Sequence, residues 1–186
     1  MELTFKSTFE IEAERVAQYF DQLEFTHQPS WKGCYCRFYH NDLPFDQLMK
    51  RTSDDNRLEM LESLKNHSMH GLLAFNENQI VAWLNINDIE NYARIYPNVP
   101  EALKHKKIAL SICFIVHPDY RGLGIATSLL EYAIKHYTNL GYEALLALPV
   151  SGSDVTSYRG PESMYTKLGY QTLETYEDFK VLFKPL

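Results

Sequence analysis

Residues 115–126 read IVHPDYRGLGIA, and this stretch decides the fold. The nearly unbroken apolar run 108–116 predicts a strand buried on both faces, and a helix is expected to begin at or near Gly122. The first turn of a helix leaves backbone N–H groups without partners and carries partial positive charge. Gly122 and Gly124 would let a diphosphate touch these donors directly, and Arg121 adds a cation at the rim. The stretch therefore predicts a strand, a glycine turn and a helix that suit a pyrophosphate.

Two better-known phosphate-binding patterns do not match this turn. The Walker pattern would need a Gly-Lys-[Ser/Thr] sequence, which is missing. The dinucleotide fingerprint fails because Ala126 and Thr127 break the spacing of its third glycine. Nucleotide hydrolysis and hydride transfer are therefore not predicted. A glycine turn that only packs the helix onto the sheet, and binds nothing, is the alternative that this stretch alone leaves open.

Length and composition fit a globular protein of one domain. The chain has 186 residues, of which 45% are hydrophobic and 23% charged. Lys and Arg number 18 against 24 Asp and Glu, so the net charge of −6 argues against a nucleic-acid partner. The apolar runs are shorter than the roughly 20 residues of a membrane helix, and the N-terminus shows no secretory signal. With only three cysteines, the protein is expected in the reducing cytoplasm, without a membrane partner.

The remaining sequence predicts an α/β (α+β) domain in which helices precede a mixed sheet. A polar excursion over 85–107 is expected to hold at most one short helical turn, and an aromatic loop is expected over 26–45. Helices are predicted over 10–24 and over 163–168. A further helix is predicted to start at Ser53, with Leu58, Leu61 and Leu64 on one face. Strands are predicted over 71–75, 79–84, 143–148, 171–176 and 179–183, and a loop over 149–161.

Two motifs resemble the GNAT family of CoA-dependent N-acetyltransferases. The family signature Arg/Gln-x-x-Gly-x-Gly/Ala is met by Arg121, Gly124 and Ala126. A later family pattern, Tyr-x-Lys-x-Gly-Phe/Tyr, is met by residues 165–170, which read YTKLGY. The resemblance implies a single GNAT-like domain with a mixed, mostly antiparallel, splayed sheet flanked by helices. Within 1–186 it implies an acceptor side in 1–70, a cofactor side in 71–148 and an acid-bearing helix with strands in 149–186.

The resemblance also implies acetyl-CoA as the acyl donor and no metal. Backbone groups of Phe114 and Val116 would pair with the pantetheine arm, as an added strand would. The side chain of Ile115, between them, would point to the opposite face of the sheet. Amides from Gly122 to Thr127 would hold the pyrophosphate. The implied cofactor-binding residues are Phe114, Ile115, Val116, Arg121, Gly122, Leu123, Gly124, Ile125, Ala126 and Thr127.

Tyr165 matches the general acid of the family, which protonates the departing thiolate. A phenol has a pKa near 10 and can lend its proton to sulfur. The alternative is that Tyr165, one of 13 tyrosines, packs its helix onto the sheet. His117, Asp88 and Glu90 are candidates for the general base, and the sequence singles out none of them.

The aromatic loop carries a second set of candidate residues. His27, Cys34, Cys36 and His40 could form a metal site, but their spacing departs from that of structural zinc sites, so no metal is expected. Trp31 and its aromatic neighbours up to position 39 instead predict a segment over the acceptor cleft, with the cysteines as small apolar residues. Cys113 is expected in the core, and the basic cluster 104–107 in a solvated loop.

The resemblance implies an N-acetyltransferase that acts on the amine of a small molecule or a peptide. The amine would attack acetyl-CoA directly in a ternary complex. An alternative is a sensor or regulatory module that binds CoA without efficient turnover. The aromatic surplus is also compatible with a homodimer interface.

Overall fold

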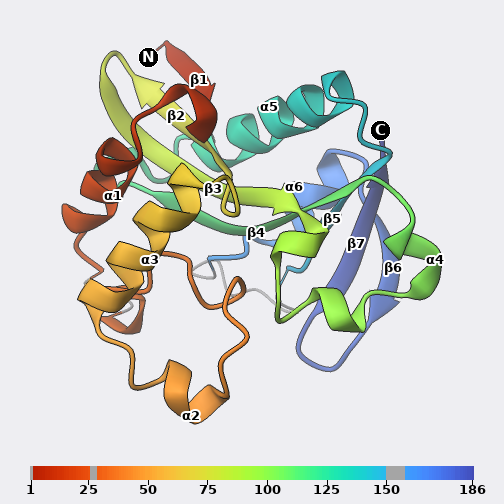
Figure 1. The fold of residues 1–186 in the computed structure, drawn as a ribbon. Helices are drawn as coiled ribbons and strands as arrows, with labels where there is room; N and C mark the ends of the chain where they lie inside the picture. The colour runs from red at the N-terminus through yellow and green to blue at the C-terminus, as the bar shows by residue number, and fades with distance from the viewer. Residues whose placement is uncertain (1, 26–28, 150–157) are drawn as a thin grey trace.

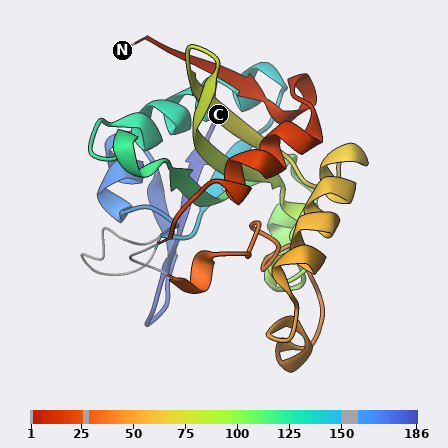
Figure 2. The same ribbon diagram turned by 90° about the vertical axis from the view of Figure 1, so that its left-hand side faces the viewer.

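The computed structural model describes residues 2–25, 29–149 and 158–186. Seven strands of these residues form one sheet, and helices lie on both sides of it (Figure 1, Figure 2). The strands are β1 (Leu3–Ser7), β2 (Gly71–Asn76), β3 (Gln79–Asp88), β4 (Ile108–Val116), β5 (Ala144–Ala147), β6 (Gln171–Thr175) and β7 (Lys180–Pro185). The helices are α1 (Ala13–Asp21), α2 (Phe45–Leu48), α3 (Ser53–Lys65), α4 (Glu101–Lys104), α5 (Ile125–Asn139) and α6 (Glu162–Lys167).

The sheet is mixed and mostly antiparallel, as the sequence predicted. Its order is β1-β2-β3-β4-β5-β7-β6, and only the pair β4 and β5 is parallel. These two strands pair over Ile108–Ser111 and Ala144–Ala147, where β5 ends. Because β4 runs on to Val116 without β5 beside it, the sheet is splayed beyond Ser111. The gap at this point positions the candidate site.

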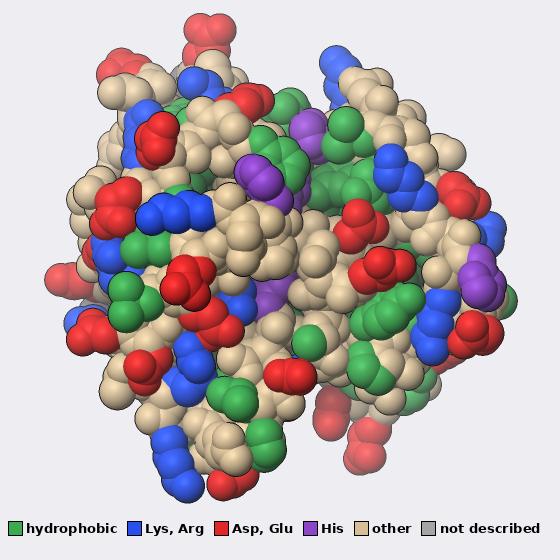
Figure 3. Space-filling view, viewed as in Figure 1, with side chains coloured by type: hydrophobic (Ala, Val, Ile, Leu, Met, Phe, Trp, Pro, Cys, Tyr) green, Lys and Arg blue, Asp and Glu red, His purple; other side chains and the backbone are tan. Residues whose placement is uncertain are grey.

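Two hydrophobic cores lie on opposite faces of the sheet. The core on the α1–α3 face contains Phe20 of α1, Met60 of α3 and Trp83 of β3. The core on the α5–α6 face contains Leu129 of α5 and Leu84 of β3, together with residues of α6. Successive side chains of a strand point to opposite faces, so the central strands β2, β3, β4 and β5 contribute to both cores. The face shown in Figure 3 mixes acidic and basic side chains without a broad patch of either sign.

Helix α3 shows how local sequence sets an element. The Thr52 hydroxyl accepts a hydrogen bond from the Asp55 amide (3.1 Å), and the Asp55 carboxylate accepts one from the Thr52 amide (2.8 Å). This capping box fixes the start of the helix. Leu61 and Leu64 are buried as predicted, but Leu58 is 62% exposed, so the prediction that all three share the buried face was wrong. Leu58 and Leu64 are six residues apart, which places them about 120° apart around a helix of 3.6 residues per turn, so Leu58 reaches solvent when Leu64 is buried.

The structure differs from the sequence prediction at three further places. Strand β1, which pairs antiparallel with β2 at the edge of the sheet, was not predicted. Strand β3 continues to Asp88, into the stretch expected to be an excursion, because Ile86–Asp88 pair with β4. Short helical segments at Ile89–Asn91, Tyr96–Asn98 and α4 then replace the single expected turn. Within the described ranges, no helix combines the length and apolar character that crossing a membrane requires.

Candidate active site

Strand β4 contains an extra residue where it parts from β5. Asn85 of β3 pairs with Cys113, whereas Ile86 pairs with Ser111, so Ile112 has no residue opposite it. A bulge of this kind bends a strand and re-aims the side chains that follow. Adjacent residues Ile112 and Cys113 therefore both join the core on the α1–α3 face, while Phe114 joins the other core.

Two hydrogen-bond donors meet at the gap between β4 and β5. The Phe114 amide donates to the Tyr158 carbonyl at 2.6 Å, and the Tyr165 hydroxyl donates to the Arg159 carbonyl at 2.7 Å. The rings of Phe114 and Tyr165 lie 6.3 Å apart. Because the two acceptors are consecutive carbonyls, donors from β4 and from α6 converge on one short piece of chain. Gly160 comes next, and a Cβ there would approach Met164 to 2.7 Å, so this piece packs tightly against α6.

Tyr165 is fully buried in α6 and makes ring contacts with Phe114 and Tyr170. Burial raises the pKa of its hydroxyl well above the usual range. The hydroxyl therefore keeps its proton at neutral pH and acts as a donor. The residue is at once a packing residue and a proton-bearing group at the gap, so the two alternatives from the sequence are not exclusive.

The glycine turn leaves open space in front of α5. Gly122 and Gly124 have φ values of +75° and +77°, a left-handed conformation that disfavours side chains, and Gly124 is the N-cap of the helix. A Cβ at either glycine would meet no atom within 4 Å from the described residues beyond its chain neighbours. The Ser128 amide bonds the Gly124 carbonyl, so the amides up to Thr127 precede the first intrahelical bond. The helix thus begins slightly later than predicted, with its unpartnered donors at an open surface.

Arg121 connects the turn to the end of β4. Its Nε donates a hydrogen bond to the Val116 carbonyl at 3.1 Å. The side chain of one predicted cofactor-binding residue is thus bonded to the backbone of another. The side chain of Ile115 belongs to the core on the α1–α3 face, opposite to Phe114, as expected. Among the other predicted residues, Leu123 is exposed, Ile125 is buried, and Ala126 and Thr127 are half-buried.

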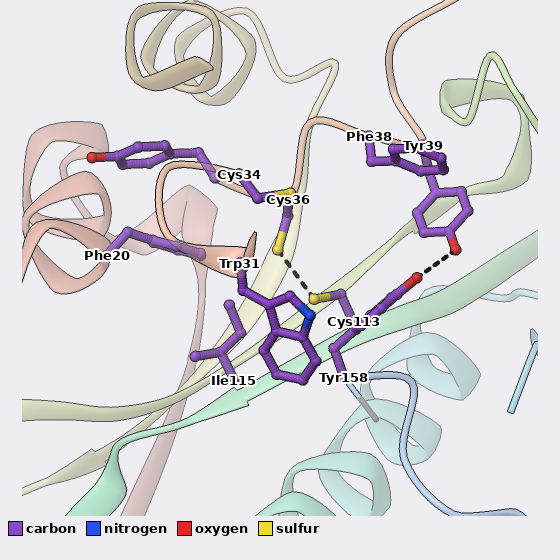
Figure 4. A pocket seen from close by; sticks show the side chains of 10 residues that line it. Phe20, Trp31, Cys34, Cys36, Phe38, Tyr39, Cys113, Ile115 and Tyr158 are labelled. Atoms are coloured by element: carbon purple, nitrogen blue, oxygen red, sulfur yellow. Dashed lines mark hydrogen bonds between the residues drawn. The ribbon is translucent and has the colours of Figure 1, made fainter. Parts of the chain in front are cut away.

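An aromatic cavity of about 180 Å³ lies on the α1–α3 face beside β4 (Figure 4). Its walls come from α1, the loop 31–39, β4 and Tyr158, and its lining contains no Asp, Glu, Lys, Arg or His side chain among the described residues. The hydroxyls of Tyr39 and Tyr158 are hydrogen-bonded at 2.8 Å. Tyr39 also lines a second cavity of about 680 Å³, which extends over Leu146 toward β7. The lining residues of the first cavity are Phe20, Trp31, Cys34, Tyr35, Cys36, Phe38, Tyr39, Cys113, Ile115 and Tyr158.

Three of the four candidate metal ligands, Cys34, Cys36 and His40, are described, and they do not form a metal site. Both ring nitrogens of His40 are engaged, by the Asn91 carbonyl and the Asn85 side chain, while Cys36 contacts Cys113. His27 lies outside the described residues, as does most of the expected loop 149–161. In the part of the chain that is described, no three His, Cys, Asp or Glu residues are placed to hold a metal ion.

None of the three base candidates lines the aromatic cavity. Asp88 pairs opposite Ala109 at the far end of β4 and accepts a hydrogen bond from Tyr142 at 2.9 Å. Glu90 is exposed. The His117 Nδ1 accepts a hydrogen bond from the Asp119 amide at 3.3 Å.

The basic cluster 104–107 lies near the C-terminal end of α5, away from the glycine turn. Lys107 donates to the carbonyl of Leu140, just beyond the last residue of that helix. Lys104 and Lys106 pair with Glu101 and Glu143. Lysines 106 and 107 are exposed, in keeping with the solvated loop that the sequence predicted.

Sequence reasoning missed three contributors to the site. Cys113 was expected only in the core, and Phe20 and Tyr158 lie in the helix predicted over 10–24 and the loop predicted over 149–161, without a role in the site. All three line the aromatic cavity. They lie far apart in the chain, so no local pattern joins them, and only the bulge in β4 turns Cys113 toward the loop.

Comparison with known proteins identifies relatives by family and by fold. The model of the acetyltransferase (GNAT) family matches residues 22–170. A GNAT-family acetyltransferase from Streptococcus pneumoniae aligns with a TM-score of 0.57 at 16% identity, over 100% of this chain and 99% of that one. The PaiA N-acetyltransferase from Thermoplasma acidophilum, in complex with coenzyme A, aligns over the whole of both chains with a TM-score of 0.56 at 16% identity.

A third similar structure contains the acyl donor itself. YncA from Salmonella typhimurium, with its cofactor acetyl-CoA, aligns with a TM-score of 0.57 at 13% identity, over 99% of this chain and 94% of that one. A comparison with curated protein sequences gives no significant match. The structural similarities concern the fold, whereas the family match spans most of the sequence, including both motifs. The chain therefore belongs to the GNAT acetyltransferase family, whose members use acetyl-CoA as acyl donor.

Proposed function

We propose that this acetyltransferase moves the acetyl group of acetyl-CoA to the amine nitrogen of a small molecule or a peptide. The observation that carries the proposal is the convergence of the Phe114 amide and the Tyr165 hydroxyl on two consecutive carbonyls, 2.6 and 2.7 Å away. A ligand with a carbonyl and a developing negative charge would offer the same two acceptors. Donors held rigidly at such a point are suited to stabilise a reacting thioester.

The residues around the gap fit the acyl donor. In this proposal the backbone of Phe114 and Val116 pairs with the pantetheine arm, and the amides from Gly122 to Thr127 hold the pyrophosphate. The absence of any atom within 4 Å of a Cβ at Gly122 or Gly124 supports this fit. Binding requires the Tyr158 carbonyl to leave the Phe114 amide. It also frees the Val116 carbonyl from Arg121, whose guanidinium then becomes available to the phosphates.

Acetyl-CoA supplies an activated acyl group. The acceptor amine attacks the carbonyl carbon, a C–N bond forms, and the C–S bond breaks. Tyr165 donates its proton to the departing sulfur, and the extra proton of the amine leaves to solvent. The raised pKa of Tyr165 supports a hydroxyl that is protonated when the thiolate departs, which is the state that a general acid needs. Both substrates bind together, so no covalent enzyme intermediate is needed.

The aromatic cavity is our candidate for the acceptor site. It adjoins the side chains of Cys113 and Ile115, on the opposite face of β4 from Phe114. A small aromatic or apolar amine suits its volume of about 180 Å³, and a longer acceptor could continue past Tyr39 into the second cavity. In this proposal residues 1–70 build the acceptor side, 71–148 the cofactor side, and 149–186 the acid-bearing part of one domain.

The test is calorimetric titration with acetyl-CoA, followed by an acceptor screen that detects free CoA thiol. We expect saturable binding, and thiol release that depends on an added amine. Amines with and without an aromatic ring, together with peptides, form the panel. Binding without release across the panel would favour a sensor that lacks efficient turnover. No binding at millimolar acetyl-CoA would overturn the proposal.

A further inference from the structure

Two cysteines from distant parts of the chain face each other in the wall of the aromatic cavity. The Sγ atoms of Cys36 and Cys113 lie 3.2 Å apart, within sulfur hydrogen-bond distance (Figure 4). Cys36 comes from the loop between α1 and α2, and Cys113 from β4, directly after the bulge. The family signature and the proposed acetyl transfer use neither thiol, so the pair calls for its own explanation.

The loop holds Cys36 in an unfavourable backbone conformation. Tyr35 and Cys36 have φ values of +45° and +53°, a region that residues with a side chain rarely adopt, least of all twice in succession. Such a conformation persists only where the surroundings enforce it. It also means that this segment is not extended, so Cys34 and Cys36 line the same cavity instead of pointing to opposite faces.

Both residues that flank Cys36 are anchored to the helices beneath. The Tyr35 hydroxyl donates to Asp21 at 2.7 Å, and the buried Arg37 pairs with Glu59 at 2.9 Å. These contacts tie the turn to α1 and α3 on either side of Cys36. The turn is thus fixed by its neighbours while the thiol itself is directed at Cys113.

The two thiols are buried but reachable. Cys36 is 6% and Cys113 is 8% exposed, and both line the cavity, through which a small molecule has access. Neighbouring Cys36 and burial raise the pKa of Cys113 well above its usual range, so Cys113 keeps its proton. Cys34, the third cysteine, forms no hydrogen bond with either sulfur among the described residues.

We propose that Cys36 and Cys113 form a redox-active dithiol that hydrogen peroxide oxidises reversibly to a disulfide. In the proposed step the Cys36 sulfur attacks one peroxide oxygen, the O–O bond breaks, and a sulfenic acid forms on Cys36 as the thiol proton leaves with the other oxygen in water. The Cys113 sulfur then attacks the Cys36 sulfur, the S–S bond forms, the S–O bond breaks, and a second water carries away the Cys113 proton. The two sulfurs lose two electrons in total and the peroxide gains them. A dithiol reductant reverses the change by thiol–disulfide exchange.

The disulfide would fasten the loop 31–39 to β4 across the aromatic cavity. Cross-linking positions that are distant in sequence restricts the unfolded chain and stabilises the fold. The bond would also replace two thiols in the cavity wall by a fixed bridge, so oxidation would alter whatever this cavity binds. Formation of the disulfide does not depend on the proposed acetyl transfer and can be tested without any acceptor.

The experiment treats the full-length protein with one to a few equivalents of hydrogen peroxide and then alkylates the remaining thiols. Mass spectrometry without reduction should show a loss of about 2 Da, a cross-linked Cys36–Cys113 peptide and alkylated Cys34, all reversed by dithiothreitol. The midpoint of thermal unfolding should rise by roughly 5–10 °C on oxidation and fall back on reduction.

Three variants provide the controls. Cys34→Ser should still form the cross-link and show the thermal shift, whereas Cys113→Ser should lose both and leave a sulfenic acid on Cys36 that dimedone traps. Cys36→Ser should lose the cross-link as well. A cross-link that involves Cys34, over-oxidation of either cysteine without a cross-link, or an unchanged thermal midpoint in the oxidised wild type would overturn the proposal.

Discussion

The two faces of the sheet differ in what builds their part of the site. On the α5–α6 face, the candidate cofactor groups are backbone amides from Gly122 to Thr127 and the amide of Phe114, all within one stretch of the chain. On the α1–α3 face, the cavity is made of side chains from α1, the loop 31–39, β4 and Tyr158. Only a few backbone conformations present several amides to one ligand. A site built from backbone amides is therefore marked in the sequence by a short glycine motif. The second kind can be assembled from many sequences.

This contrast gives a rule for which substitutions should affect which ligand. Changes in backbone conformation at the glycine turn should reduce donor binding, and changes in side chains of the aromatic cavity should affect the acceptor. Tyr165 is the exception, because it is a side chain that reaches the gap from the cofactor face. The three predictions below test the contrast, beginning with this exception.

The largest effect is expected for Tyr165→Phe. Loss of the proton donor should lower the acetyl-transfer rate by about 10²-fold or more, while acetyl-CoA affinity changes little. Tyr170→Phe is the matched control, since the Tyr170 hydroxyl is buried next to Tyr165 and has no hydrogen-bond partner in the described structure. That variant should keep its rate within about twofold. Rates measured by thiol release over a pH series would contradict the acid role if Tyr165→Phe matched the wild type throughout.

Each face also holds a histidine that is kept neutral. Burial lowers the pKa of His40, on the α1–α3 face, and of His70, beneath α5, to about 4 each. The unfolded chain, with a histidine pKa near 6.5, binds more protons below that pH, so acidification destabilises the fold. Each histidine should remove about 2 kcal/mol of unfolding free energy between pH 7 and pH 5.

Urea unfolding at the two pH values measures this loss. His40→Gln should show a pH dependence smaller by about 2 kcal/mol, and His70→Gln should show the same on the other face. Equal pH dependence in the wild type and both variants would mean that neither histidine is held neutral.

The smallest effect on stability is expected at the glycine turn. Gly124→Ala should lower unfolding free energy by about 1 kcal/mol through its left-handed φ, and should weaken acetyl-CoA binding by about tenfold or more. Gly141→Ala is the control at the other end of α5, with φ +72° and equally open space. It should lose similar stability and no affinity. If both variants bind acetyl-CoA as the wild type does, the glycine turn is a packing device.

Much of the fold could be predicted because its elements have strong local patterns. The apolar run of β4 matched the structure from Ile108 to Val116, and the strands predicted over 71–75 and 79–84 correspond to β2 and to most of β3. Strand β1 was not predicted, although Leu3 and Phe5 alternate with polar residues, because five residues of alternation are a short signal and pairing with β2 defines the strand. The end of β3 was not predicted because Asn85, Asn87 and Asp88 are residue types typical of loops, although pairing with β4 holds them in the strand.

The candidate site was predictable on one face only. The family resemblance drew on residues whose roles depend on local backbone shape, such as Gly124, and on the helix that carries Tyr165. The hydrogen bond between Tyr39 and Tyr158 joins residues far apart in sequence, so no local sequence pattern predicts it. The contact between Cys36 and Cys113 needs both the left-handed turn and the bulge, which are products of tertiary packing.

The extra residue in β4 has a consequence for how side chains are shared between the faces. Before the bulge, the even-numbered residues Ile108, Leu110 and Ile112 point to the α1–α3 face; after it, the odd-numbered Cys113 and Ile115 do so. The bulge thus moves the alternation of side chains between the two faces by one residue. A regular strand of the same nine residues would aim Phe114 into the aromatic cavity and Cys113 at α6. A single inserted position decides which residues the donor meets and which the acceptor meets.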